Sequence, residues 1–325
     1  MIDGCGRKID YIRISVTDRC NLRCQYCMPE DGVEMVSHGD ILTFNEIVRS
    51  VNILAGLGIT KVKITGGEPL VRKNIAALIS DIKEIDGISS VTLTTNGVLL
   101  SEQIGDLYSA GIDAINVSLD TLNPEVFRFI TRRDDLGKVL RGIDAALAYP
   151  DIALKINCVP FGIENQNLWE LTDFARDNNI HVRYIEMMPI GFGKEYNCLT
   201  ESEIIALLES KTGEELIPYD GILGNGPCHY YSVNGFAGKI GFISAISHKF
   251  CDSCNRVRLT ATGFLKNCLQ YEYGSELRKY LRDGTDDENL SKIIEATIMN
   301  KPVGHQFLSG EIANENGHMM SQIGG

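Results

Sequence analysis

A regular alternation of strand and helix signals over residues 10–189 is the feature that most constrains the fold of this chain. Short runs rich in β-branched and aromatic residues predict strands at residues 11–16, 61–65, 90–95, 114–119, 154–159 and 182–188. Apolar residues at three- and four-residue spacing predict helices at residues 44–58, 75–87, 101–111, 140–149 and 167–179. Strands that alternate with helices form parallel βαβ units. This spacing fits an incomplete (β/α)6 barrel of the TIM type, and a doubly wound sheet is the alternative.

Polar residues within or beside these strands favour the barrel. Side chains alternate between the two faces of a strand, and one face of each predicted strand carries a polar row. The rows are Arg13 and Ser15; Lys61, Lys63 and Thr65; Thr92, Thr94 and Asn96; Asn116, Ser118 and Asp120; Lys155 and Asn157; His181 and Arg183. A parallel sheet covered on both faces would instead be almost continuously apolar. A solvent-exposed strand end explains any single residue equally well, but all six rows together predict a polar lumen. The cations of this lumen could bind a polyphosphate; they are Arg13, Lys61, Lys63, Lys155 and Arg183.

The alternation of strand and helix signals changes from about Cys198 onward. Residues 230–247 and 256–269 predict hairpins around glycine turns, and residues 275–284 and 287–300 predict two helices. No proline-rich linker separates this part from the first. We therefore expect a partial-barrel core over residues 1–190. An α+β extension over residues 191–325 is expected to pack against the core and close the barrel mouth.

Composition and charge narrow the class of protein. The chain of 325 residues is 44% hydrophobic, and no apolar run reaches the roughly 20 residues of a membrane span. Its first residues lack the apolar segment of a signal peptide, which predicts a cytoplasmic protein with no membrane partner. The net charge of -12 argues against a general nucleic-acid surface, although it allows a local cationic pocket.

Three cysteines, Cys20, Cys24 and Cys27, share one short polar stretch with the spacing C-x3-C-x2-C. In a large chain without an export signal, cysteines are more often reduced thiols or metal ligands than disulfides. Three thiolates on a four-iron cluster leave one iron open to an outside ligand. A zinc knuckle or unconnected buried thiols are the alternatives.

A second set, Cys251, Cys254 and Cys268, has the spacing C-x2-C-x13-C and again offers three ligands. Zinc completed by His248 or Cys228 is the alternative to a second iron–sulfur cluster. The remaining cysteines have no partner pattern and are interpreted as buried or loop thiols. They are Cys5, Cys158, Cys198 and Cys228.

The first cysteine loop, with Tyr26 before its third cysteine, resembles the cluster-binding loop of radical S-adenosylmethionine (SAM) enzymes. The motif GGEP, residues 66–69, follows the second predicted strand in register with this loop. Together with LTTNG, NVSLD, the second cysteine region and the terminal IGG, these motifs resemble the GTP 3′,8-cyclase (MoaA) family over nearly the whole chain. The resemblance implies a lyase that converts GTP to (8S)-3′,8-cyclo-7,8-dihydroguanosine 5′-triphosphate in molybdenum cofactor biosynthesis.

The resemblance also implies cofactors and site residues. It assigns one [4Fe-4S] cluster to Cys20, Cys24 and Cys27, and a second, in the 191–325 region, to Cys251, Cys254 and Cys268. The implied SAM-binding residues are Tyr26, Gly66, Gly67, Glu68, Ser118 and Met188. The implied GTP-binding residues are Arg13, Lys63, Thr94, Lys155, Arg256, Val257 and Arg258. Position 63 is commonly arginine in relatives, so whether Lys63 contacts phosphate stays open.

In the implied reaction a 5′-deoxyadenosyl radical removes H3′ from GTP, and the C3′ radical attacks C8 of guanine. Arg256, Arg258, Gly324 and Gly325 would position the reactants, with the terminal glycines inserted toward the cavity. Composition alone indicates a disordered tail instead. The implied partners are an external one-electron donor and a downstream cyclic pyranopterin monophosphate synthase, and a homodimer stays open. The alternative functions are a radical SAM maturase acting on a peptide and a non-catalytic iron–sulfur or zinc protein that binds nucleotide.

Overall fold

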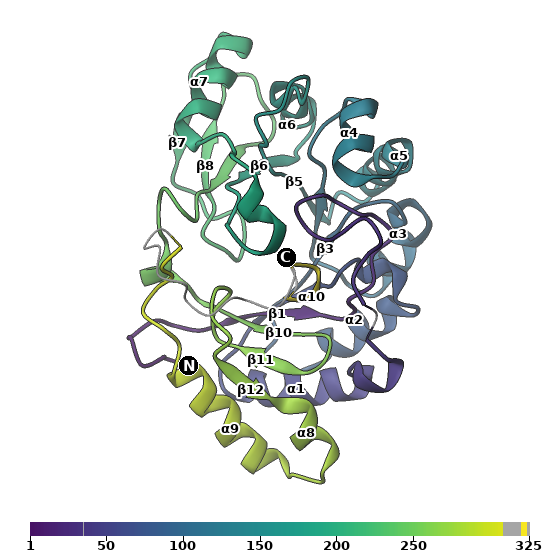
Figure 1. Ribbon diagram of the computed structural model, residues 1–325, viewed down its shortest axis with the longest axis vertical. Helices are drawn as coiled ribbons and strands as arrows, with labels where there is room; N and C mark the ends of the chain where they lie inside the picture. The colour runs from purple at the N-terminus through teal and green to yellow at the C-terminus, as the bar shows by residue number, and fades with distance from the viewer. Residues whose placement is uncertain (35, 308–319, 324–325) are drawn as a thin grey trace.

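One continuous sheet organises the fold in the computed structural model, which describes residues 1–34, 36–307 and 320–323 (Figure 1). Its strand order within the described residues is β12-β11-β10-β1-β2-β3-β4-β5-β6-β9-β8-β7. The central strands are parallel and lie in chain order. They are β1 (Tyr11–Ser15), β2 (Lys61–Thr65), β3 (Ser90–Thr95), β4 (Ala114–Ser118), β5 (Ala153–Cys158) and β6 (His181–Ile185). All six predicted strands are therefore present.

The C-terminal part extends this sheet at both edges. Strand β10 (Arg256–Leu259) pairs in parallel with β1, and β9 (Ile240–Ile243) pairs in parallel with β6. Antiparallel partners follow outside them: β11 (Phe264–Lys266), β12 (Gly274–Glu276), β8 (His229–Ser232) and β7 (Ile217–Tyr219). The sheet does not close on itself, so the incomplete barrel is confirmed. An open barrel has two edges of unpaired backbone groups, and β10 and β9 satisfy them.

Helices cover the outer face of the core sheet (Figure 1). They are α1 (Phe44–Gly56), α2 (Ile75–Lys83), α3 (Leu100–Ser109), α4 (Pro124–Thr131), α5 (Leu136–Leu147) and α6 (Thr172–Asp177). A capping box between Thr43 and Glu46 begins α1. Helix α4 is not among the predicted helices, although Asn123 caps it and Pro124 occupies its first turn, a recognisable start signal.

The remaining helices belong to the second part of the chain or to short connections. The helices α7 (Glu201–Thr212), α8 (Leu277–Arg282), α9 (Asp287–Met299) and α10 (Met320–Ile323) follow the core. Short 3-10 turns occur at η1 (His38–Asp40), η2 (Pro69–Val71), η3 (Leu168–Leu171), η4 (Gly191–Glu195) and η5 (Cys251–Ser253). Both predicted C-terminal helices correspond to α8 and α9. Among the described residues, no helix is long and apolar enough to cross a bilayer.

The hydrophobic core lies between the sheet and the outer helices. Ile12 and Ile14 of β1 and Ile64 of β2 are completely buried there, among side chains such as Leu54 and Ile79 of the covering helices. The intervening residues of the strands face the other way. Strand alternation therefore separates an apolar outer face from a polar inner face, and the inner face forms the candidate site.

Candidate active site

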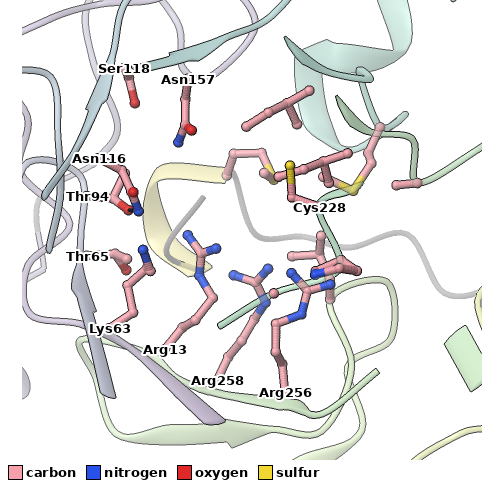
Figure 2. Close-up of a pocket in the computed structure, with 18 of the residues that line it drawn as sticks. Arg13, Lys63, Thr65, Thr94, Asn116, Ser118, Asn157, Cys228, Arg256 and Arg258 are labelled. Atoms are coloured by element: carbon pink, nitrogen blue, oxygen red, sulfur yellow. Dashed lines mark hydrogen bonds between the residues drawn. The ribbon is translucent and has the colours of Figure 1, made fainter. Parts of the chain in front are cut away.

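The inner face of the sheet surrounds a cavity of about 530 Å³. Strand register brings its polar residues to the same level, because Arg13 pairs with Lys63 on one side and with Arg258 on the other. Figure 2 shows Arg13, Arg256 and Arg258 side by side, reaching into the cavity. Across the lumen, β4 and β5 contribute further polar lining residues: Asn116, Ser118, Lys155 and Asn157.

The predicted lumen cations divide into two groups. Arg13, Lys63, Lys155 and Arg183 line the cavity. Lys61 lies nearer the strand start, where its Nζ is 3.2 Å from Asp10 Oδ2, and it is not a lining residue. His181 is also absent from the lining, and its Nδ1 accepts a hydrogen bond from the Lys239 amide. These two lie on the predicted strand face but outside the cavity.

Crowding of positive charge dominates the electrostatics of the lumen. Burial lowers the pKa of Lys63 well below its usual value, and Arg183, Arg13, Lys155 and Arg256 lower it further. Burial and Arg183 similarly lower the pKa of Lys155 to about 8. Like charges held this close in a buried site repel one another. A ligand with several negative charges would relieve that repulsion.

The first cysteine loop lies at the same cavity, with Cys20, Cys24 and Cys27 all lining it. Cys20 Sγ accepts hydrogen bonds from the Leu22 amide at 3.4 Å and from Asn96 Nδ2 at 3.7 Å. The amide of Cys27 donates to the Cys24 carbonyl at 2.9 Å, which turns the backbone between the two thiols. Three thiols in one short loop, two of them on one turn and the third accepting N–H groups at its sulfur, fit the donor set of an iron–sulfur cluster.

The GGEP segment clamps the cysteine loop from the side of β2. The amide of Gly67 donates to the Thr17 carbonyl at 2.7 Å, and the amide of Glu68 donates to the Arg19 carbonyl at 2.7 Å. A Cβ on Gly67 would come within 2.7 Å of the Asp18 oxygen and would clash with the Arg19 carbonyl. Close approach to the cysteine loop is therefore one physical reason for glycine at this position.

Replacing Gly67 with alanine is expected to destabilise the protein, because the new methyl group overlaps the backbone of the cysteine loop. Overpacking of this kind costs about 1–3 kcal/mol. Thermal unfolding would show a lower midpoint, accompanied by weaker assembly of iron at the first cysteine set. The matched control is Gly56→Ala at the end of α1, where a Cβ meets no atom within 4 Å. Equal midpoints for the two variants would contradict the clamp.

Two buried carboxyl groups stand beside the first cysteine loop. Burial raises the pKa of Glu68 to about 7, although Leu70, Thr95 and Asn96 donate hydrogen bonds to it. Burial likewise raises the pKa of Asp120 to about 6, and Tyr26 donates to Asp120 Oδ2 at 3.1 Å. Both carboxyls line the cavity and can bind cationic or hydroxyl groups of a ligand.

The other residues implied for SAM reach the same region. Gly66, Ser118 and Met188 all line the cavity, as Tyr26 and Gly67 do. The carbonyl of Met188 also accepts a hydrogen bond from the Ile190 amide at 2.8 Å.

The second cysteine set lines the cavity as well, on the side of β10. The amide of His305 donates to Cys251 Sγ at 3.4 Å. Burial would raise the pKa of Cys254, but the charges of Arg256 and Lys301 and hydrogen bonds from Arg256 outweigh it and lower the pKa to about 7. A thiol so close to cations is easily deprotonated, as a metal ligand must be.

The two candidates for a fourth zinc ligand lie in different places. His248 is exposed, with its Nδ1 3.5 Å from Glu201 Oε2, and it is not a lining residue. Cys228 lines the cavity, near Lys155 and Arg183, and burial raises the pKa of its thiol to about 11. Within the described ranges, no three His, Cys, Asp or Glu side chains have the arrangement of a single-ion site. Of the other cysteines, Cys158 is buried and Cys5 exposed, while Cys198 is half-buried.

Of the residues implied for GTP, Thr94 also lines the cavity, and one residue, Val257, does not. It lies between Arg256 and Arg258 on β10, so its side chain points to the opposite face and packs in the core. Only its backbone can contact a ligand in the cavity. Thr94 accepts a hydrogen bond from Asn116 Nδ2 at 3.4 Å.

The end of the chain reaches this cavity as helix α10. Met320 lines the cavity, and Arg258 Nη1 donates to the Ile323 carbonyl at 3.3 Å. Figure 1 shows α10 near the centre of the molecule, close to the labels of β1 and β10. The predicted positioning residues Gly324 and Gly325 lie outside the described residues.

Arg183 was predicted as a lumen cation, and Asn157 stands on a predicted polar row without a role of its own. Arg183 donates to Asn157 Oδ1 at 2.9 Å, and strand alternation was the signal for both residues. Two further lining residues had no signal in the sequence. Lys301 and Gln270 line the cavity from the C-terminal part. Both residues lie in irregular segments, where no periodic pattern in the sequence indicates which side chains face the cavity.

Comparison with known proteins divides the chain into two matched parts. Residues 14–177 match the Radical SAM superfamily model, and residues 180–307 match the Molybdenum Cofactor Synthesis C model. The chain is 44% identical to "GTP 3′,8-cyclase" of Clostridium perfringens (strain 13 / Type A) over 100% of both chains. It is 46% identical to "GTP 3′,8-cyclase" of Heliobacterium modesticaldum, again over 100% of both.

A solved structure gives independent support for the fold. SuiB of Streptococcus suis bound to S-adenosylmethionine superposes with a TM-score of 0.65 over 90% of this chain and 68% of that chain. Its sequence identity to this chain is 14%, so the likeness extends to the fold alone.

Proposed function

Because the chain belongs to the GTP 3′,8-cyclase family of radical SAM enzymes, we propose that its cavity holds SAM and GTP between two [4Fe-4S] clusters. The enzyme cyclises GTP to (8S)-3′,8-cyclo-7,8-dihydroguanosine 5′-triphosphate in molybdenum cofactor biosynthesis. One observation carries the detailed proposal: both three-cysteine sets open on one cavity that also contains a buried cluster of cations.

At one end, Cys20, Cys24 and Cys27 would hold the first cluster, and the clamp from Gly67 and Glu68 would fix their loop. SAM would lie against Tyr26, Gly66, Gly67, Glu68, Ser118 and Met188. When bound there with the reduced cluster, SAM supplies the 5′-deoxyadenosyl radical that removes the C3′ hydrogen of GTP. The Glu68 carboxylate would accept the amino group of SAM, whose positive charge offsets the cost of a buried anion.

At the other end, the cation cluster would bind the triphosphate. Arg13, Lys63 and Arg258 line the cavity on neighbouring strands, and Lys155 lines it from β5 across the lumen. Several charge-assisted hydrogen bonds can therefore reach one polyphosphate. This crowding of cations favours a nucleotide triphosphate over a peptide substrate. The position of Lys63 supports a phosphate contact, and Arg183 extends the same cluster. Val257 would contribute through its backbone alone.

Beside the cations, Cys251, Cys254 and Cys268 would hold the second cluster and present its open iron to guanine. The proximity of Arg256 to Cys254 supports thiolate ligation there. The walls of the cavity and helix α10 would exclude water while a carbon radical exists.

Two partners complete the proposal. The cyclisation needs an external one-electron donor to reduce the first cluster. The product, a reactive cyclised nucleotide, would pass to cyclic pyranopterin monophosphate synthase.

Replacing Arg256 or Arg258 with alanine is expected to weaken GTP binding or cyclisation by about 10–100-fold, since each charge-assisted bond is worth about 1.5–3 kcal/mol. Anaerobic incubation with SAM, dithionite and GTP, followed by mass spectrometry, measures both 5′-deoxyadenosine and the new GTP isomer. Iron content should stay at the parental value. The control Lys292→Ala changes an exposed cation that pairs with Glu288 on α9. Parental cyclisation by both arginine variants would show that these residues are only structural.

Stabilisation by GTP is expected to depend on pH through Lys155. Its pKa of about 8 in the folded protein lies below the usual value of about 10.4. The unfolded chain therefore binds more protons between these values, and stability without ligand rises with pH across that window. In the ligand-free protein, Lys155 is mostly charged at pH 7 and mostly neutral at pH 9.5. A triphosphate binds the charged form, so GTP should stabilise the protein more at pH 7 than at pH 9.5. The shift of the unfolding midpoint on adding GTP to the anaerobic protein, at pH 7 and at pH 9.5, measures this effect. In Lys155→Met the two shifts should be nearly equal. The same pH dependence in the parent and in Lys155→Met would contradict the role of Lys155.

A further inference from the structure

The first residues of the chain form a small hairpin against the segment that follows α9. Ile2 and Lys8 form an antiparallel bridge, and the amide of Gly4 donates to the Met299 carbonyl at 3.2 Å. A Cβ on Gly4 would clash with that carbonyl. The hairpin therefore packs closely on the backbone of the C-terminal part, far away in sequence.

At the centre of this contact lies Arg7, which is buried and uses all five of its N–H donors. Its Nε donates to Asp3 Oδ2 at 2.7 Å. Its Nη1 donates to the carbonyls of Cys251 and Val303, at 3.0 and 2.9 Å. Its Nη2 donates to the carbonyls of Lys301 and Pro302, at 3.3 and 2.8 Å. One side chain thus joins the N-terminal hairpin, the second cysteine region and residues 301–303.

Residues 301–305 form the wall behind the second cysteine set. A Cβ on Gly304 would lie 3.2 Å from Cys251 Cβ, and the His305 amide donates to Cys251 Sγ. Lys301 Nζ donates to the carbonyls of Arg256 and Asn267, at 2.9 and 2.5 Å. Arg256 is two residues after Cys254, and Asn267 directly precedes Cys268. Arg7 and Lys301 together therefore fix all three cysteine-bearing segments.

We propose that Arg7, anchored by Asp3, is a positioning residue that sets the geometry of Cys251, Cys254 and Cys268 for cluster binding. This inference rests on the proposed second cluster. Removing the guanidinium takes a donor from each of four carbonyls. It also takes the opposite charge from the buried Asp3 carboxylate, to which only the backbone amides of Cys5 and Arg7 would still donate. Both losses are costly in a buried site. Lysine keeps the charge but lacks the planar fork with five donors, so it cannot replace these contacts.

Iron content separates this role from a general effect on folding. Anaerobically reconstituted parent should contain about eight irons per chain. Arg7→Ala and Arg7→Lys should fall toward about four, while both still cleave SAM because the first cluster remains. Arg49→Lys is the matched control: Arg49 also bonds an aspartate, Asp287, and two carbonyls, but it belongs to α1 and joins that helix to the α8–α9 region. Retention of about eight irons by both Arg7 variants would overturn the proposal.

Thiol labelling gives a readout that does not depend on the cluster. In metal-free protein, Arg7→Lys should increase the rate at which a maleimide modifies Cys251 several-fold relative to Cys24 in the first set. Asp3→Asn removes the anchoring charge with little change in shape and should act in the same direction. If the parent itself binds only about four irons, the second cluster fails, yet the labelling still tests Arg7. If the labelling of Cys251 relative to Cys24 is unchanged in both Arg7→Lys and Asp3→Asn, the positioning role of Arg7 is overturned. This test holds even if Arg7→Ala does not fold.

Discussion

Replacing Cys24 with alanine is expected to abolish the reductive cleavage of SAM. Cys24 is one of only three proposed ligands of the first cluster, so its loss leaves too few thiolates to hold four irons. Replacing Cys268 should instead damage the GTP end first, because Cys268 lines the cavity with the second set. Each variant should lose about half of the roughly eight irons of the parent. Iron and sulfide analysis and the yield of 5′-deoxyadenosine without GTP distinguish them.

The control for this pair is Cys5→Ala, which changes an exposed cysteine outside both sets. Its iron content and SAM cleavage should match the parent. A parent with about four irons and one zinc would refute the second iron–sulfur cluster. SAM cleavage by Cys24→Ala would refute the assignment of the first.

Ending the chain at Ile323 is expected to remove most GTP cyclisation while leaving the iron content unchanged. Ile323 is buried, and its carbonyl accepts a hydrogen bond from Arg258, so the last residue that the structure describes lies beside the proposed GTP site. Glycine has no side chain to occupy space there, and a terminal carboxylate can meet the cationic groups of the lumen. The role is positioning, so thermal stability should change little. Mass spectrometry of the cyclised product gives the measurement.

A second tail variant tests whether the end itself matters. Extending the chain by a few residues beyond Gly325 keeps both glycines but moves the carboxylate. Cyclisation should fall again, while GTP still binds and both clusters remain. If the shortened and the extended protein both cyclise GTP as fast as the parent, the tail has no role in the reaction.

Strand alternation gave the inner face of the core from sequence alone. Ile12 and Ile14 are completely buried toward the helices, while Arg13 between them faces the cavity. This worked because side-chain direction in a strand depends only on neighbouring residues. Lys61 shows the limit, since a residue on the correct face but near the strand start lies outside the cavity.

Contacts between distant segments could not be predicted in the same way. The pairing of β10 with β1 and of β9 with β6 depends on which strand edges an open barrel leaves free. Four of the five hydrogen bonds of the Arg7 guanidinium reach carbonyls 244–296 residues away, and a carbonyl carries no sequence signal. The clamp from Gly67 onto the cysteine loop also could not be predicted, because a glycine at a strand end can equally indicate a simple turn.

The order of the sheet also has a consequence for biosynthesis of the protein. Tyr11 pairs with Arg256, so the edge of β1 stays open until most of the chain has left the ribosome. The first cysteine loop and its clamp take their backbone hydrogen bonds from residues up to Thr131 at the end of α4, whereas the cation cluster needs Arg256 and Arg258 beside Arg13. During synthesis the chain can therefore form the first cysteine site well before any nucleotide pocket. Such long-range pairing slows folding, and it delays nucleotide capture until the protein is nearly complete.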